Sequence, residues 1–299
     1  MKELTNKIIE YFNLEDENYN ISSLGLVDSK IEGTITFVDD EKYIKEAVSN
    51  DDVNAIIITK NLYQEYCDKT DKKLIISDDP RYDFYSIQNE LAVENFKNNR
   101  FESEVHESAE IHETSFVAKY NVKISKNVTI EPNVTILENV IIGEGTHVSA
   151  GTVIGAEGFE HKRTSKGILS VKHDGKVIIG KKVFIGALNG ISKGFSFQHT
   201  VIDDETKTDN LVHIAHGVHV GKRCFLPASC VLSGSVTLGD DVWVGPNATV
   251  SSQINVANQA YITLGSVVTR DVERGKHVTG NFAIDHKQYL KVLKNNLRL

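Results

Sequence analysis

The chain has 299 residues, of which 40% are hydrophobic and 25% are charged, and its formal net charge is −8. This length allows one large or two modest domains. The acidic balance argues against a nucleic-acid partner, because phosphate binding needs clustered Lys and Arg. No apolar run approaches the ~20 residues of a membrane span, and the charged start lacks a secretory signal. With three cysteines and no CxxC spacing, these features favour a cytoplasmic protein.

The first hundred residues predict a small α/β domain, which we place at 1–103. The expected helices are Lys2–Phe12, Glu41–Val48 and a segment that starts after Asp79 at Pro80, a residue suited to a helix start. Between them, the apolar runs GTITFV, NAIIIT and KLIIS predict buried strands.

A six-residue repeat dominates the rest of the chain. Aliphatic residues recur at every sixth position in three runs, broken in the last one only by Thr208: Ile124 to Ile154, Ile179 to Ile191, and Ile202 to Val268. This period fits neither a helix nor an alternating strand, and it is typical of a parallel β-helix whose hexapeptides each form a short strand and a corner. Three hexapeptides close a triangular coil of about 18 residues, so residues ~18 apart stack at the strand spacing of ~4.8 Å.

We therefore predict a mainly β fold with a β-helix over 104–270 and about eight coils from Val105 onwards. The register is interrupted around 156–176, where a basic segment with Lys162 and Arg163 predicts a loop thrown out from the prism. Long excursions of this kind are often functional. The last residues, 271–299, end in an amphipathic helix that could pack against a partner subunit.

Three histidines spaced three apart, His213, His216 and His219, raise the question of a metal site. In the hexapeptide register Ile214 and Val220 point inward, so His213 and His219 lie on successive faces turned ~120° apart. They then cannot converge on one ion within a chain, where ligand bonds of only ~2.0–2.1 Å are needed. A zinc ion held between subunits, a single catalytic base, and a purely structural role remain as alternatives.

Four motifs in order resemble the UDP-3-O-acylglucosamine N-acyltransferase family over nearly the whole chain. They are TFVDDEKY at 36–43, VIGAEGF at 153–159 followed by KVIIGKKVFIGA, DNLVHIAHGVHVG at 209–221, and SGSVTLGDDVWVG at 233–245. The resemblance implies a left-handed β-helix, a homotrimer and a nucleotide-binding role for the front domain.

The resemblance also implies a catalytic set in which His216 is the general base. An imidazole can take the proton that an amine loses on attacking a thioester at neutral pH. Gly234 matches the family's oxyanion glycine and lies one coil beyond His216, where its N–H can stabilise the developing charge. Asp209 is the candidate for orienting the base, while Gly217 stands where relatives often carry Asn or an acidic residue.

Substrate residues follow from the same likeness. Phe37 and Tyr43 match the aromatics that hold the uracil ring, with Asp40 in place of an Asn. A pyrophosphate needs cations, which Lys42 or the basic loop near Arg163 could supply, and His213 is placed to touch the substrate.

For the acyl donor, Arg270 matches the position that contacts the phosphopantetheine arm, and Gln253 stands where the family tends to have His. The segment HVTGNFA resembles a signature of CoA-dependent sugar acetyltransferases. The donor is therefore acyl-CoA or an acyl carrier protein, with no tightly bound cofactor and no metal.

Together these features predict a homotrimeric N-acyltransferase that acts on a nucleotide-linked amino sugar, similar to the enzyme of lipid A synthesis. One alternative is a CoA-dependent N-acetyltransferase of a UDP- or dTDP-amino sugar for another surface glycan. More distant alternatives are a zinc-dependent, carbonic-anhydrase-like enzyme and a β-helix scaffold without catalysis.

Overall fold

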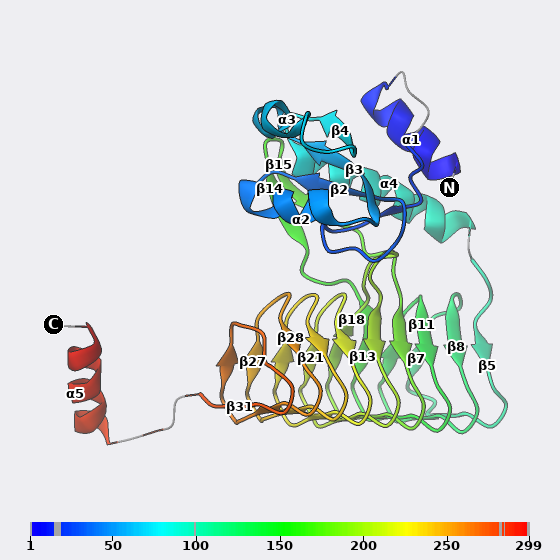
Figure 1. The fold of residues 1–299 in the computed structure, drawn as a ribbon. Helices are drawn as coiled ribbons and strands as arrows, with labels where there is room; N and C mark the ends of the chain where they lie inside the picture. Colours follow the sequence, from blue (N-terminus) through cyan, green and yellow to red (C-terminus); the bar gives the residue numbers. More distant parts are fainter. Residues whose placement is uncertain (1, 15–18, 99, 281–282, 284, 298–299) are drawn as a thin grey trace.

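The computed structural model describes residues 2–14, 19–98, 100–280, 283 and 285–297. It places a small α/β domain on one side of a long prism of stacked strands, with the last helix beyond the end of the prism (Figure 1). The fold class expected from the sequence, a left-handed parallel β-helix with an α/β domain in front and a helix behind, is confirmed.

The α/β domain holds a parallel sheet of order β1-β2-β3-β4. Its strands are β1 (Ser23–Leu24), β2 (Thr34–Val38), β3 (Val53–Ile58) and β4 (Lys73–Ile76). Its helices are α1 (Lys2–Phe12), the 3₁₀ turn η1 (Glu41–Tyr43), α2 (Ile44–Ser49), α3 (Lys60–Tyr66) and α4 (Pro80–Asn98). The expected helix at Glu41–Val48 is thus two elements, because Asp40 caps a 3₁₀ turn by accepting from the Lys42 N–H at 3.1 Å. The short elements β1 and α3 were not expected.

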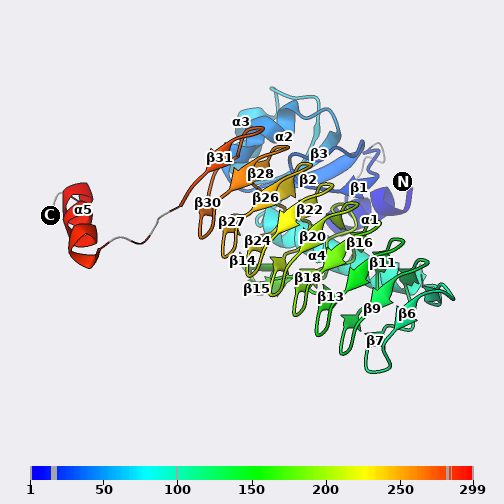
Figure 2. The same ribbon diagram turned by 90° about the horizontal axis from the view of Figure 1, so that it is seen from below.

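The prism consists of three parallel sheets whose strands follow one another along a single axis (Figure 2). The first sheet contains β7 (Phe116–Val117), β10 (Thr135–Ile136), β13 (Val153–Ala156), β18 (Gly190–Ser192), β21 (His213–Ile214), β24 (Val231–Leu232), β27 (Thr249–Val250) and β30 (Val267–Val268). The second contains β5 (Glu104–Val105), β8 (Val122–Ile124), β11 (Val140–Ile142), β16 (Val177–Ile179), β19 (Thr200–Ile202), β22 (His219–Val220), β25 (Thr237–Leu238) and β28 (Asn255–Val256). The third contains β6 (Glu110–Ile111), β9 (Thr129–Ile130), β12 (His147–Val148), β17 (Phe184–Ile185), β20 (Lys207–Thr208), β23 (Phe225–Leu226), β26 (Trp243–Val244), β29 (Tyr261–Ile262) and β31 (His277–Val278).

The aliphatic residues of the hexapeptide repeat fill the prism. Ile214 pairs with Leu232, 18 positions later, and both side chains are fully buried in one continuous core. Ile136 and Ile154 repeat this arrangement in an earlier coil. The repeat therefore fixes both the inward face and the stacking register.

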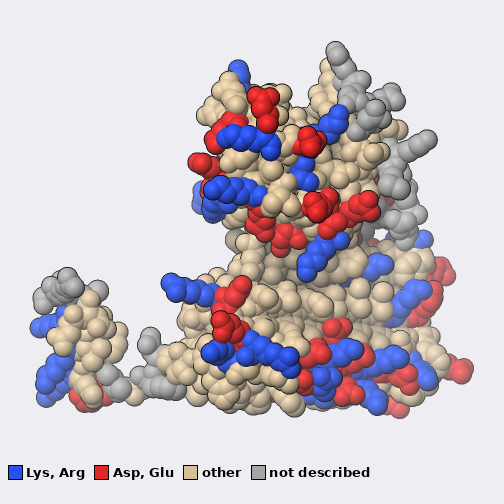
Figure 3. Space-filling view, in the orientation of Figure 1, with Lys and Arg blue, Asp and Glu red and all other residues tan. Residues whose placement is uncertain are grey.

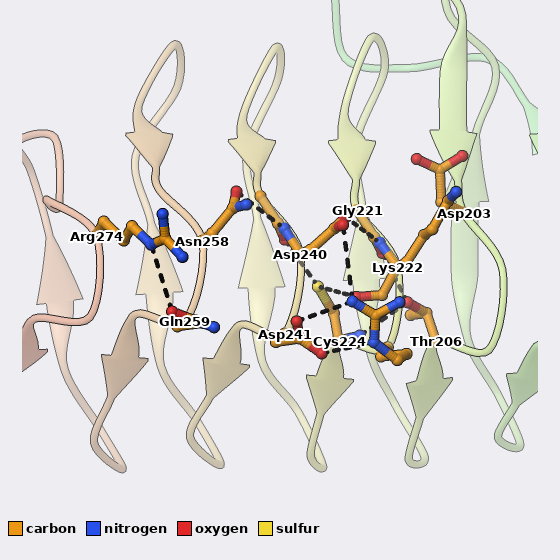
Figure 4. A network of polar contacts seen from close by, with 12 residues as sticks. Asp203, Thr206, Gly221, Lys222, Cys224, Asp240, Asp241, Asn258, Gln259 and Arg274 are labelled. Carbon is orange, nitrogen blue, oxygen red and sulfur yellow. Dashed lines mark hydrogen bonds and ion pairs between the residues drawn. The ribbon is translucent and has the colours of Figure 1, made fainter.

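The corners of the prism depend on unusual backbone geometry and on cross-coil hydrogen bonds. Asn121, Asn127, Asn133 and Asn139 have positive φ, a region that Asn tolerates better than most residues. Along one corner, Asp240 accepts from the Lys222 N–H at 2.9 Å (Figure 4). Such bonds satisfy amides that leave the strand ladders.

Two insertions interrupt the coils. Between β13 and β16 the chain forms an antiparallel hairpin of β14 (His161–Thr164) and β15 (Gly167–Ser170), within the excursion expected at 156–176. The hairpin rests on the start of α4, where Asp79 accepts from the Ser165 N–H at 2.6 Å and the Lys166 ammonium lies 4.0 Å from the centre of the Tyr82 ring. A second, shorter insertion at 193–199 separates β18 from β19, and sequence reasoning passed over it.

Beyond residue 270 the prism continues, because β31 still pairs with β29. The last helix, α5 (His286–Leu297), is exposed along the side chains described. Among the described helices, none is long and apolar enough to cross a membrane. Charges of both signs alternate along the lower part of the prism (Figure 3).

Candidate active site

A pocket of about 790 Å³ lies between the α/β domain and the prism. The prism side contributes His213, His216 and Gly234, and the α/β domain contributes Phe37 and Tyr43. The two insertions supply further walls, with Phe159, Glu160 and Lys162 from the first and Phe195, Phe197 and Gln198 from the second. The α/β domain, the prism and both insertions thus meet around one cavity.

His216 and Gly234 are in contact across neighbouring coils, as expected for residues that are 18 positions apart in the repeat. A Cβ added at Gly234 would lie 2.7 Å from both Cε1 and Nε2 of His216, so only glycine fits against this ring. The Gly234 N–H donates to none of the described residues. Gly234 itself lines the pocket, which makes its N–H a candidate donor to a bound ligand.

The carboxylate at His216 comes from Glu160 on the hairpin side of the pocket. Glu160 Oε2 lies 3.3 Å from His216 Nε2, and both side chains are largely buried. Its other oxygen, Oε1, accepts from Lys162 and lies 3.5 Å from the Tyr85 hydroxyl. Burial raises the pKa of Glu160, but the hydrogen bond from His216 and the charge of Lys162 outweigh it and lower the pKa to about 2. The carboxylate is thus ionised at neutral pH.

This finding corrects the expectation for Asp209. Asp209 accepts from the Asn210 N–H at 2.7 Å and is not part of the pocket wall. The other ring nitrogen of His216, Nδ1, is buried and has no hydrogen-bond partner within the described part of the chain.

A second imidazole, His173, packs beside the first. Their ring centroids are 5.3 Å apart, and Phe195 stacks on His173 at 4.5 Å. His173 is fully buried, and its Nδ1 lies 2.7 Å from Glu157, which also bonds Lys193 at 3.1 Å. Burial raises the pKa of Glu157, but these two partners lower it to about 2. Glu157 thus links His173 of the first insertion to Lys193 of the second.

The three evenly spaced histidines have different surroundings. His213 and His216 line the pocket, and burial lowers the pKa of His213. His219 lies on another sheet of the prism, where its Nε2 is 2.9 Å from Asp203. In the described ranges, no three His, Cys, Asp or Glu side chains are grouped so that they could hold a metal ion.

The expected nucleotide residues divide between two cavities. Phe37 packs against Phe84 at 5.0 Å and, with Tyr43, reaches the main pocket. Asp40 instead lines a smaller neighbouring cavity of about 370 Å³, which also contains Arg81 and Arg163. The Lys42 ammonium lies 4.5 Å from the Tyr43 ring centre and is in neither wall.

Of the expected donor residues, Gln253 lines the pocket, one coil beyond Ser235. Arg270 is exposed and is not in the wall, although it continues the corner that carries His216, Gly234 and Ser252 at intervals of 18. In the segment HVTGNFA, Asn281 and Phe282 lie outside the described residues.

Sequence reasoning missed Glu160 and the second insertion. The signal for the insertion was present, since Ile191 and Ile202 are 11 positions apart where the repeat requires a multiple of six. Glu160 had no such signal, because its place beside His216 depends on how the hairpin docks on α4.

The repeat matches two family models. Residues 121–156 match the bacterial transferase hexapeptide (six repeats), and residues 217–252 match the hexapeptide repeat of succinyl-transferase. The matched segments are thus hexapeptide repeats, and the prism that contains them is a left-handed parallel β-helix.

Similar curated proteins carry the name of one specific enzyme. A UDP-3-O-acylglucosamine N-acyltransferase of Acidovorax sp. is 42% identical over 133 residues, which cover 44% of this chain and 40% of that protein. Its counterpart from Albidiferax ferrireducens is 34% identical over 133 residues, with the same coverage. The resemblance to this family is thereby confirmed for the matched part, and the match spans about 40% of the length of these relatives.

Among solved structures, a UDP-N-acetylglucosamine acyltransferase superposes with a TM-score of 0.50 at 22% identity, covering 64% of this chain and 76% of the other. This likeness supports the fold alone.

Proposed function

We propose that the chain is an N-acyltransferase that moves an acyl group from a thioester to the amino group of a nucleotide-linked sugar. The observation that carries the proposal is the contact between His216 and Gly234 in a pocket whose opposite wall is formed by Phe37 and Tyr43. A base, an available N–H donor and an aromatic nucleotide wall are the parts that this reaction needs. The relatives named as acyltransferases point the same way.

In the proposed reaction the amine nitrogen attacks the thioester carbonyl carbon, and a C–N bond forms. The Gly234 N–H donates to the resulting oxyanion, an interaction worth ~3–4 kcal/mol of barrier in enzymes of known mechanism. His216 takes the proton lost by the nitrogen. The intermediate then collapses, the C–S bond breaks, and the thiolate leaves with that proton.

The finer features of the proposal are a homotrimer, a cytoplasmic location and a donor that is either acyl-CoA or an acyl carrier protein. An exposed aromatic column on the third sheet supports self-association, because Phe184, Phe225 and Tyr261 are 40%, 51% and 37% exposed in the single chain. Small side chains at Ser233 and Ser252 leave space along the corner for the donor.

The decisive experiment replaces His216 by Ala and measures acyl transfer to a set of UDP- and dTDP-amino sugars. We expect turnover to fall by ~10²–10⁴-fold while the chain stays folded and nucleotide-sugar binding is retained. His219→Ala, on another sheet, is the matched control and should retain turnover. Near-normal acyl transfer by His216→Ala contradicts the proposal.

A further inference from the structure

A buried hydroxyl group without a partner belongs to the α/β side of the pocket. Thr36 is fully buried on β2 and is part of the pocket wall, next to Phe37. Its Oγ1 has no hydrogen-bond partner within the described ranges of the chain. A buried polar group without a partner destabilises a fold, and native proteins contain few of them. The position of this one at a cavity suggests that a ligand completes it.

Thr34, two positions earlier in the same strand, shows the ordinary arrangement of a buried threonine. Its Oγ1 donates to the Ile31 carbonyl oxygen at 2.6 Å and lies 2.8 Å from Ser29 Oγ. Thr34 is also fully buried, but it is not part of the pocket wall. The fold thus satisfies the hydroxyl that lies away from the cavity and leaves the one beside the cavity without a partner.

The surroundings of Thr36 fit a flat ring with polar edges. Phe37 and Tyr43 contribute aromatic rings to the wall, and Leu26 contributes an aliphatic side chain beside them. Such side chains pack against the faces of a ring, but the polar edge of a nucleobase loses water on binding and needs hydrogen-bond partners. Thr36 can supply one of them, because rotation about χ1 exchanges its hydroxyl and methyl positions without moving the backbone.

The carboxylates in the same wall cannot serve every edge of a base. Asp28 and Glu46 lie there, and an ionised carboxylate only accepts, so it can pair with an N–H of a base but not with a carbonyl oxygen. A threonine hydroxyl can donate. We infer that Thr36 is a further nucleotide-binding residue, whose hydroxyl donates to a carbonyl oxygen of a pyrimidine base. The inference rests on the proposed function, which supplies the nucleotide, and it adds a contact that holds the edge of the base.

The test combines two variants of the full chain with three ligands. Thr36→Val exchanges the hydroxyl for a methyl group, and Thr34→Val makes the same exchange where the hydroxyl is bonded within the fold. The ligands are UDP, 2-thio-UDP and 4-thio-UDP, in which sulfur, a weaker acceptor, replaces one carbonyl oxygen of the base. Titration calorimetry at pH 7 gives the dissociation constants, and scanning calorimetry gives the melting temperatures without ligand.

We expect one thio analogue to bind the unaltered chain about three- to tenfold more weakly than UDP. Thr36→Val should weaken UDP binding by a similar factor and should bind UDP and that analogue about equally. Thr34→Val should keep the affinities of the unaltered chain. Without ligand, Thr34→Val should lower the melting temperature by about 2–4 °C, because it removes a bond that the fold makes, whereas Thr36→Val should not lower it.

Three results would overturn the inference while the proposed function stands. They are undiminished UDP binding by Thr36→Val, equal binding of all three ligands by the unaltered chain, and a deficit of the thio analogue that persists in Thr36→Val. An equal loss of melting temperature in both variants would also overturn it, since the Thr36 hydroxyl would then have a partner within the fold. If UDP does not bind the unaltered chain, the inference is wrong, and acyl transfer by His216→Ala decides on the proposed function separately.

Discussion

The regular coils and the two insertions of the prism differ in what they contribute. The coils hold almost all of the prism's aliphatic core and repeat one geometry, whereas the insertions at 156–176 and 193–199 carry charged and aromatic side chains into the pocket. His216 and Gly234 belong to the coils, and Glu160 and Phe195 belong to the insertions. The rigid repeat thus positions His216 against Gly234, and the two insertions surround this contact with charged and aromatic side chains.

The largest effect that tests this comparison is expected for stability in the coils. Ile142→Ala removes a fully buried side chain from the prism core and should lower the free energy of unfolding by ~2–5 kcal/mol. Ile168→Ala in the hairpin, where the side chain is 71% exposed, is the control and should change little. Chemical denaturation measures both, and equal losses would contradict the division between frame and insertion.

At the place where the coils form the site, Gly234→Ala should act on activity. The added Cβ would meet the imidazole of His216 at 2.7 Å and displace it from the proposed oxyanion donor, so turnover should fall by ~10²–10³-fold. Gly190→Ala is matched, since its Cβ would meet His213 at an ordinary 3.5 Å. Steady-state kinetics decide the matter, and similar turnover in both variants would refute the assigned contact.

The insertion should impose a pH dependence on stability. The pKa of Glu157 is about 2 in the folded chain against an ordinary 4.5, so the unfolded chain binds more protons between these values. Stability is therefore present above pH ~4.5 and is lost as the pH falls towards ~2. Glu157→Gln should flatten this decline by ~1–2 kcal/mol after allowance for its half-exposed side chain.

Melting curves from pH 2 to 7 measure this decline. The exposed Glu113→Gln serves as the control and should follow the unaltered chain. An unchanged acid decline in Glu157→Gln would show that its pairing with His173 and Lys193 does not stabilise the fold.

The smallest effect concerns a single corner of the coils. Asp240→Ala removes the acceptor of the Lys222 N–H and should cost about 1 kcal/mol, whereas Asp240→Asn keeps an acceptor and should restore most of it (Figure 4). Thermal unfolding compares the two, and equal losses would assign the effect to charge and not to the hydrogen bond.

The sequence by itself determined the prism, because hexapeptide periodicity is a local property that sets the inward face of every strand. The same periodicity determined that His216 and Gly234 stack, since residues 18 apart meet on neighbouring coils. The same periodicity also separated His219 from His213 and His216. The three evenly spaced histidines therefore do not form one metal site within the chain.

Only the tertiary structure decided which carboxylate faces His216. Asp209 stays at its own corner, and Glu160 reaches His216 because the hairpin packs on α4 through Ser165 and Lys166. These contacts join positions about 85 residues apart, and no period relates them. They form only when the hairpin packs against the α/β domain, and a local sequence pattern cannot predict such long-range packing.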